Sequence, residues 1–242
     1  MKHTYHTERK IDMGTHWSPL TDEPIDTVHL TFDEQMSLLN KNIKSHKHIV
    51  FFGGAGVSTA SGIPDFRSED GLYHQHGVQF DNYEPEYLLS RECLYHNPIV
   101  FYEFYRQKLD CRHSQPNAAH FKLAEMEAAG KLDCVVTQNI DGLHQKAGSK
   151  NVFETRGQIR PDITLYGEQL PHAFTDAIKA IENADMLIVA GTSLAVHPAN
   201  TILSYFTGDM LVLVNHTETE FDTHAQLTFR EDITDVFDQI AL

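Results

Sequence analysis

The chain has 242 residues, 41% of them hydrophobic, and a formal net charge of −15. This length suits one large domain or one domain with a small insertion, and the negative charge argues against a nucleic-acid partner, because phosphate binding needs a basic surface. No apolar run approaches the length of a membrane span, and the first residues lack the apolar core of a secretion signal, so we expect a cytoplasmic protein with no membrane partner.

Cysteine and histidine usage gives no sign of a metal site. Cys93, Cys111 and Cys134 form an odd set without a Cys-x-x-Cys pair. Such spacing is typical of reduced, buried thiols and not of a disulfide framework or a zinc site. The 16 histidines form no ligand-like cluster on a convincing helix. We therefore expect no bound metal.

The hydrophobic pattern of the chain changes sharply at about residue 32. Residues 1–31 are polar with little periodicity, and we expect an N-terminal arm, extended along the domain or loose, with Trp17 as its natural anchor. The domain itself is expected to span residues 32–242. Apolar residues at helical spacing predict a helix over residues 32–45, and the apolar run at residues 49–52 predicts a buried strand.

A glycine-rich turn follows this strand. Gly53, Gly54 and Gly56 interrupt the apolar pattern, and a helix can start near Val57. A strand, a glycine turn and a helix in this order are typical of a dinucleotide site, where the helix N-terminus faces the pyrophosphate. Alone the turn is weak evidence. The loop at residues 62–68 adds an acid, an aromatic and a base, although by itself it also suits a Pro-Asp turn.

Residues 54–67 read GAGVSTASGIPDFR and contain every letter of the pattern GAG-x-S-x-x-S-G-I-P-D-F-R. This stretch resembles the first nucleotide-binding motif of the sirtuins, the NAD-dependent protein deacylases. In that family the loop closes over the nicotinamide ribose, so the resemblance implies NAD as the cofactor. The implied cofactor-binding residues here are Gly54, Ala55, Gly56, Ser58, Asp65, Phe66 and Arg67.

Between residues 68 and 113 the alternation of strands and helices stops, and aromatic residues become dense. Short helices are predicted at residues 85–90 and 98–111, and we interpret the segment as an insertion that packs a small core of its own. In sirtuins the corresponding region forms a helical small module beside the cofactor. A further helix is expected to open at Pro116 and to close at Gly130.

A second apolar run, residues 134–137, predicts a strand whose C-terminal end carries Gln138, Asn139 and Asp141. Open α/β sheets place ligands at such ends, although Asp141 also suits a helix cap. The sequence TQNIDGLH resembles the second sirtuin motif. The resemblance implies that Asn139 and Asp141 line the nicotinamide pocket as catalytic residues, with Asp141 accepting from the carboxamide. It also implies cofactor contacts by Gln138, near the nicotinamide ribose, and by Ile140.

Two more buried strands are predicted, at residues 186–190 and 211–214. The first leads into GTSLAVHPA, which resembles the third sirtuin motif, and small hydroxyl residues there leave room for a phosphate. The resemblance implies that Asn215, at the end of the second, binds the adenosine ribose. The cofactor-binding residues of the third motif are Gly191, Thr192 and Ser193.

Further elements complete the expected fold. A short strand is predicted at residues 152–154, and helices at residues 172–183 and 232–242. Strands that alternate with helices indicate an α/β protein. We expect a doubly wound, mostly parallel Rossmann-like sheet with a small helical insertion module and no zinc ribbon.

Residues 164–168 read TLYGE and resemble the sirtuin segment that pairs, backbone to backbone, with an extended substrate peptide. The resemblance therefore implies an acylated or ADP-ribosylated protein as the partner. The implied peptide-binding residues are Tyr166, Gly167, Glu168 and Val196.

The chain departs from the sirtuin pattern in two places. First, the family's zinc module, with two Cys-x-x-Cys pairs, would lie between Gly157 and Arg160, where only Gln158 and Ile159 stand. A short turn can close this gap, because the module hangs from two stems that lie close together. No zinc is expected.

Second, the family's general base is the histidine of Glu-x-His-Gly, which here reads Glu154-Thr155-Arg156-Gly157. Arginine cannot accept a proton, and general-base catalysis is worth about 10²–10⁴-fold. A guanidinium about 4 Å from a developing positive sugar adds about 1 kcal/mol of repulsion in water and about 4 at an effective dielectric constant of about 20. Alternatively, Arg156 swings out to solvent or pairs with an acid such as Glu154 or Asp162.

Three functions are compatible with these residues. The first is an NAD-dependent protein-lysine deacylase, as the resemblance implies, impaired by the loss of its base. The second is a protein ADP-ribosyltransferase or NAD glycohydrolase, which needs Asn139 and Asp141 but no base to activate the ribose hydroxyl. The third is a non-catalytic module that binds NAD or ADP-ribose, in which Arg156 holds an anion or a neutral product.

Overall fold

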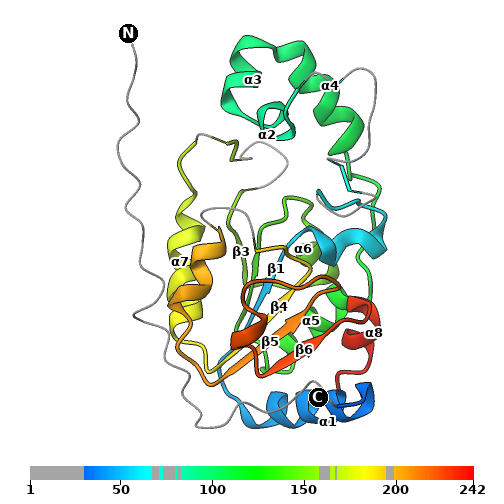
Figure 1. Cartoon of the computed structure of the whole chain (residues 1–242), viewed down its shortest axis with the longest axis vertical. Coiled ribbons are helices and arrows are strands. Elements are labelled where there is room, and N and C mark those ends of the chain that lie inside the picture. Colours follow the sequence, from blue (N-terminus) through cyan, green and yellow to red (C-terminus); the bar gives the residue numbers. More distant parts are fainter. Residues whose placement is uncertain are drawn as a thin grey trace.

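A parallel sheet of six strands forms the centre of the molecule, in the order β3-β2-β1-β4-β5-β6 (Figure 1). This computed structural model describes residues 30–66, 71–72, 80, 83–157, 164–166, 168–194 and 199–242. The N-terminal arm with Trp17 lies outside the described residues. Within them, no helix has the length and apolar character needed to cross a bilayer.

The strands are short and all five of their pairings are parallel. The chain runs from β1 outward to β3 on one side and then returns to β4 on the other side of β1. The order therefore reverses between β1 and β4, and open α/β sheets place ligands at such switch points. The strands are β1 Ile49–Gly53, β2 Cys134–Thr137, β3 Val152–Glu154, β4 Met186–Ala190, β5 Met210–Val214 and β6 Leu227–Phe229.

Two hydrophobic cores, one on each face, explain why the strands read as continuous apolar runs. Successive residues of a strand point to opposite faces. Phe51 therefore packs in one core and Phe52 in the other, both with 0% exposure. Such double burial is typical of parallel strands covered by helices on both sides.

Helices cover both faces of the sheet (Figure 1). On one side lie α7 His172–Glu182 and the 3-10 helix η3 Ala199–Tyr205; on the other lie α1 Phe32–Ser45, α5 Ala118–Ala128 and α8 Ile233–Asp238. The doubly wound class is therefore confirmed. Shorter elements are α6 Leu143–Ala147 and the 3-10 helix η4 Asp222–His224.

The helix expected to start near Val57 is instead a 3-10 helix, η2 Ala55–Ser61. It ends at Gly62, whose φ of 79° is left-handed and easily adopted only by glycine. Strand β6 was not predicted, because its three residues carry no distinct pattern.

The helical module lies beyond the C-terminal ends of the strands (Figure 1). It contains α2 Pro85–Leu88, α3 Arg91–His96 and α4 Pro98–Lys108 and packs a third core around Leu88, Cys93 and Phe104. α2 lies within the helix expected over residues 85–90, α4 begins where the helix expected over residues 98–111 begins and ends earlier, and α3 was not predicted. The predicted boundaries of the module and of the domain remain predictions.

Candidate functional site

Glycines at the ends of β1 and β4 bring two loops into direct backbone contact. The Gly54 N–H donates to Ala190 O (3.1 Å), and the Gly56 N–H donates to Gly191 O (2.8 Å). A Cβ atom on Gly54 would lie 2.7 Å from Gly191 O, and one on Gly191 would lie 2.4 Å from Val57 N. Gly191 also has a φ of +60°. Only glycine fits this crossing, which leaves bare backbone facing the space above the sheet.

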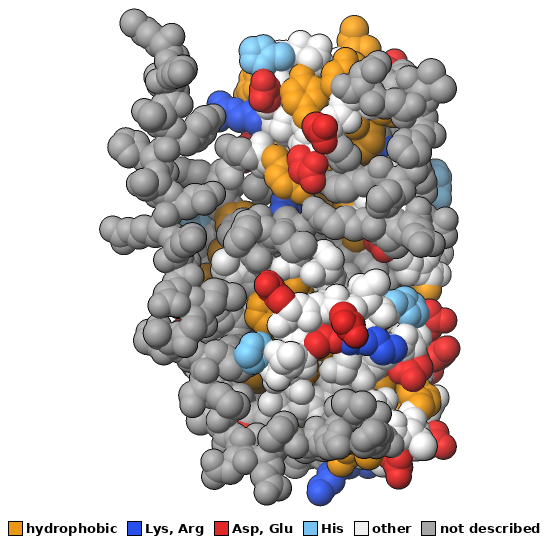
Figure 2. Space-filling model, in the orientation of Figure 1, with side chains coloured by type: hydrophobic (Ala, Val, Ile, Leu, Met, Phe, Trp, Pro, Cys, Tyr) orange, Lys and Arg blue, Asp and Glu red, His pale blue; other side chains and the backbone are white. Residues whose placement is uncertain are grey.

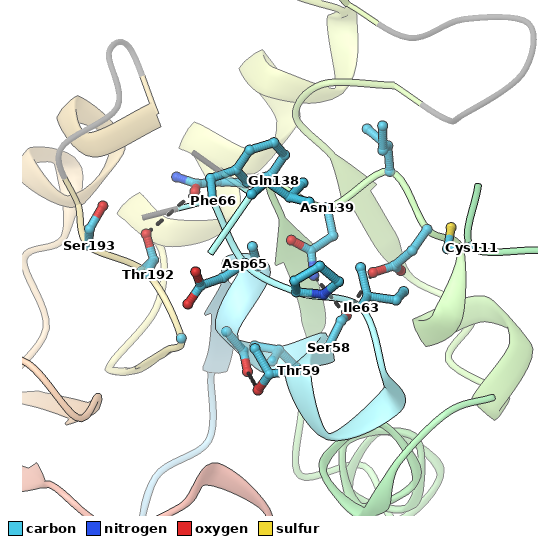
Figure 3. Close-up of a pocket in the computed structure, with 18 of the residues that line it drawn as sticks. Ser58, Thr59, Ile63, Asp65, Phe66, Cys111, Gln138, Asn139, Thr192 and Ser193 are labelled. Atoms are coloured by element: carbon cyan, nitrogen blue, oxygen red, sulfur yellow. Dashed lines mark hydrogen bonds between the residues drawn. The ribbon is translucent and has the colours of Figure 1, made fainter. Parts of the chain in front are cut away.

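Three polar side chains, one that follows β1 and two that follow β2, form one hydrogen-bonded group. Ser58 Oγ donates to Asp141 Oδ2 (2.7 Å), and Asn139 Nδ2 donates to Ser58 Oγ (3.1 Å). Figure 3 shows Ser58 and Asn139 facing each other at the centre of the site. Asp141 Oδ1 also accepts from the Leu143 N–H (2.9 Å), the first N–H of α6. The N-cap residue of α6 is Gly142, so Asp141 caps the helix from one residue before the N-cap position, and a role as site residue stays compatible with this geometry.

Gln138 crosses from β2 toward the loop that follows β4. Its N–H donates to Gly53 O (2.9 Å), and Thr192 Oγ1 donates to its Oε1 (3.4 Å). Among the described residues its buried Nε2 has no partner. A buried donor without a partner is unfavourable, so a ligand that accepts from Gln138 would be stabilised here.

A cavity of about 470 Å³ opens above these strand ends. Most predicted site residues line it, and the exceptions are few. Gly54 and Glu168 are not in the wall, and Glu168 Oε2 accepts from the Leu165 N–H (3.0 Å). Arg67, Gly167 and Val196 lie outside the described residues. The predicted residues in the wall are Ala55, Gly56, Ser58, Asp65, Phe66, Gln138, Asn139, Ile140, Asp141, Arg156, Tyr166, Gly191, Thr192, Ser193 and Asn215.

Arg156 lies in the wall of this cavity beside Tyr166. Its guanidinium carbon is 5.3 Å from the centre of the Tyr166 ring, which is a cation–π distance. Its carbonyl oxygen accepts from the Thr164 N–H (2.8 Å), which ties residue 156 to the start of the next described segment. In the described part of the chain no carboxylate pairs with Arg156. Glu154 Oε1 accepts from Gln145 Nε2 (2.8 Å), and Asp162 lies outside the described residues.

The backbone of Tyr166 is already paired with the helical module. Its N–H donates to Leu89 O (3.2 Å), and its carbonyl accepts from the Arg91 N–H (3.1 Å). Pairing of this segment with a substrate strand would therefore use residues adjacent to Tyr166. That pairing stays a prediction.

Sequence reasoning missed one end of the cavity. His216 and Thr217 follow β5, and Asp232 to Thr234 begin α8. His216 Nε2 lies 3.1 Å from Asp232 Oδ1, and Asn215 Nδ2 donates to Thr217 O (3.1 Å). The unrecognised strand β6 places α8 here, which is why these residues were not expected.

Two buried histidines, His120 and His144, lie next to each other near the site. Their ring centres are 4.7 Å apart, and each residue is at most 1% exposed. Burial lowers the pKa of His120 to about 4 and that of His144 to about 3, so both are neutral at pH 7. Asn117 links this pair to the site, because its Oδ1 lies 3.0 Å from His120 Nδ1 and its Nδ2 donates to Val57 O (2.8 Å).

Within the described residues no group of three or more His, Cys, Asp and Glu side chains is placed to hold a metal. Burial raises the pKa of the Cys134 thiol to about 12 and also raises that of Cys93. Both thiols therefore stay protonated at pH 7, and metals bind the thiolate form.

Comparisons with known proteins agree with this arrangement. The profile of the Sir2 family matches residues 54–160 and 155–198. The "NAD-dependent protein deacetylase" of Clostridium acetobutylicum is 41% identical, in an alignment that covers 86% of this chain and 98% of the relative. That of Staphylococcus epidermidis is 40% identical and covers 82% of this chain and 93% of the relative.

Solved structures show the same similarity. A structure described as "Sir2 bound to acetylated peptide" has a TM-score of 0.74 and 30% identity, over 85% of this chain and 96% of the other. A "Sir2-p53 peptide-NAD+" complex has a TM-score of 0.73 and 31% identity, with the same coverage.

Proposed function

Because this chain belongs to the Sir2 family, we propose that its cavity binds NAD and that it transfers a group between NAD and acyl-lysine side chains of proteins. The reaction proposed first is protein-lysine deacylation. Relatives of about 40% identity are named for this activity. The observation that carries the proposal is the meeting of all three motifs around one cavity.

Each end of the cavity has donors and acceptors suited to a different part of NAD. The glycine crossing at Gly54 and Gly191 would let a pyrophosphate approach the backbone of the two loops from the cavity side, where Ala55, Thr192 and Ser193 lie. Asn139 and Asp141 would receive the nicotinamide carboxamide, with Ser58 fixing the carboxylate. Asn215, at the other end, would hold the adenosine ribose.

NAD would supply ADP-ribose as the acceptor of the acyl group once nicotinamide leaves. Asn139 and Asp141 orient the leaving group and exclude water around it. The protein substrate would enter past Tyr166, which lies in the cavity wall beside Arg156 and belongs to the segment that resembles the family's peptide-pairing segment. Two similar structures are described with peptides, which supports a protein substrate.

We propose further that Arg156 limits deacylation. The family profile matches in two segments that overlap at residues 155–160, and this break in the match supports a missing module at that point of the chain. The altered base position rests on the sequence alone, in which Arg156 stands where the family pattern has histidine. Arginine cannot act as a base, and its charge opposes a developing cation.

The same residue favours a second candidate, protein ADP-ribosylation or NAD hydrolysis. This chemistry uses the nicotinamide pocket around Asn139 and Asp141 but needs no base to activate the ribose hydroxyl. Arg156 therefore impairs it less than it impairs deacylation.

Mass spectrometry of the products separates these reactions. The protein is incubated with NAD, with and without an acetyl-lysine peptide. Deacylation gives free nicotinamide, acetyl-ADP-ribose and a peptide whose mass is lower by one acetyl group. Hydrolysis gives nicotinamide and ADP-ribose without the peptide, and transfer adds ADP-ribose to protein. Unchanged NAD in every arm, at high enzyme concentration, would contradict both reactions.

A further inference from the structure

A second depression, which we call the module groove, lies on the helical module next to the cavity. It has a volume of about 630 Å³ and is open to solvent. Apart from Tyr166, none of its residues belongs to the motifs described above. The residues that line it are Glu86, Tyr87, Ser90, Arg91, Glu92, Tyr95, His96 and Tyr166.

The module groove continues directly from the cavity. Tyr166 lines both, so the groove and the cavity meet at this residue. Tyr166 is held from two sides: its backbone pairs with Leu89 and Arg91, and the Arg156 guanidinium lies over its ring. A polypeptide whose modified lysine enters the cavity past Tyr166 therefore passes the module groove with its neighbouring residues.

The groove combines aromatic rings with carboxylates. Tyr95 is 68% exposed. Arg91 is the only arginine in the groove lining, and its guanidinium carbon lies over the Tyr95 ring, 5.3 Å from the ring centre. Glu92 is exposed and has no ion-pair partner among the described residues. Glu86 adds a second carboxylate to the lining. Figure 2 shows acidic and hydrophobic side chains together on the module at the top of the molecule.

We propose that the module groove binds a lysine or arginine side chain of the substrate protein, close in sequence to the modified lysine. This inference rests on the proposed function, since it needs a protein substrate in the cavity. A cation gains from the Glu92 carboxylate, which is exposed and has no ion-pair partner among the described residues, whereas cations of the chain already lie over the rings of Tyr95 and Tyr166. The net charge of −15 adds long-range attraction for basic segments. The occupant is thus a basic polypeptide segment and not an acidic one.

Peptide binding tests the proposal without requiring turnover. A labelled acetyl-lysine peptide with uncharged flanks is compared, by fluorescence anisotropy, with peptides that carry one arginine at each position up to six residues on either side. We expect at least one position to bind about fivefold tighter than the uncharged peptide. An extended chain advances about 3.3 Å per residue, so the best position also measures the distance from cavity to groove.

Glu92→Lys should remove this gain, because the charge facing the arginine is reversed, and Glu92→Gln should remove part of it. The matched control is Glu182→Lys at the end of α7, which changes the net charge equally but lies outside the groove. Glu182→Lys should keep the positional gain.

Several results would overturn the proposal: no position at which arginine improves binding, equal losses in Glu92→Lys and Glu182→Lys, or no binding of any peptide. Calorimetry with NAD separates this failure from failure of the proposed function. A wild-type chain that binds NAD but shows no arginine preference refutes the groove alone. A chain that binds no NAD refutes the proposed function.

Discussion

At the scale of single residues, the proposed limit on deacylation lies at Arg156. This residue lies in the cavity wall over Tyr166, and its carbonyl accepts from the Thr164 N–H. The Arg156 backbone holds Thr164 by a hydrogen bond, and the Arg156 side chain places a positive charge in the cavity wall. A substitution at this position changes the charge and leaves the backbone hydrogen bond in place.

Arg156→His should raise the turnover of an acetyl-lysine peptide by at least about tenfold. Histidine restores an accepting nitrogen, and about tenfold is below the usual gain from a positioned base, since a 1 Å displacement alone can remove about 10²-fold. NAD affinity should change much less. The assay compares peptide turnover in wild type, Arg156→His and Arg156→Ala. Equal rates in all three would mean that this side chain does not face the reacting centre.

Gly191→Ala should destabilise the protein by about 2 kcal/mol or more, as measured by urea unfolding. Its φ of +60° costs about 1–2 kcal/mol for a residue with a Cβ atom, and that atom would lie 2.4 Å from Val57 N. Gly130→Ala is the control, because Gly130 has a φ of +71° with no atom within 4 Å of the added Cβ. The control should show only the backbone penalty. Equal losses in the two variants would mean that the loop crossing has room to relax.

At the scale of elements, the sequence predicted strands better than helices. β1, β2, β4 and β5 are continuous apolar runs, and burial on both faces makes such runs unambiguous. η2 and β6 depend on tertiary contacts, the glycine crossing with Gly191 and the pairing with β5, which no local pattern records. The part of the site that depends on β6, near His216 and Asp232, was missed for the same reason.

The buried histidine pair makes α5 and α6 sensitive to acid. Both folded pKa values, about 4 and about 3, lie below the ordinary value of 6.5. The unfolded chain therefore takes up protons first as the pH falls. The stabilisation is complete above pH 6.5 and is lost progressively as the pH falls toward these folded values, by up to about 1.4 kcal/mol per pH unit for each histidine.

His144→Leu should reduce the number of protons that the chain takes up on unfolding by about one, so the pH dependence of stability should weaken. Urea unfolding at pH 7, 6 and 5 measures it, and the free energy of unfolding should fall less steeply in the variant than in wild type. His113→Leu changes an exposed histidine and serves as the control, with the wild-type slope expected. A slope for His144→Leu that equals the control's would show that the pair does not contribute to acid sensitivity.

At the scale of the whole molecule, the fold holds its site without the residues of a four-thiolate zinc centre. We predict that the purified protein contains far less than one zinc per chain. The reason is that the chain has no Cys-x-x-Cys pair and that the thiols of Cys93 and Cys134 are protonated at pH 7. Elemental analysis after exhaustive dialysis measures this, and a ratio near one zinc per chain would contradict it.

The central claim is that the cavity binds NAD with its nicotinamide end at Asp141, and calorimetry with NAD and with ADP-ribose tests it most directly. Asp141→Asn keeps an oxygen to accept from the Leu143 N–H, so the cap on α6 persists, but it removes the charged acceptor for the carboxamide. The account predicts that wild type binds both ligands and that Asp141→Asn weakens NAD by about tenfold, with ADP-ribose changed by less than about threefold. Equal weakening of both ligands would make Asp141 a structural cap alone, and a wild-type chain that binds neither would contradict the account.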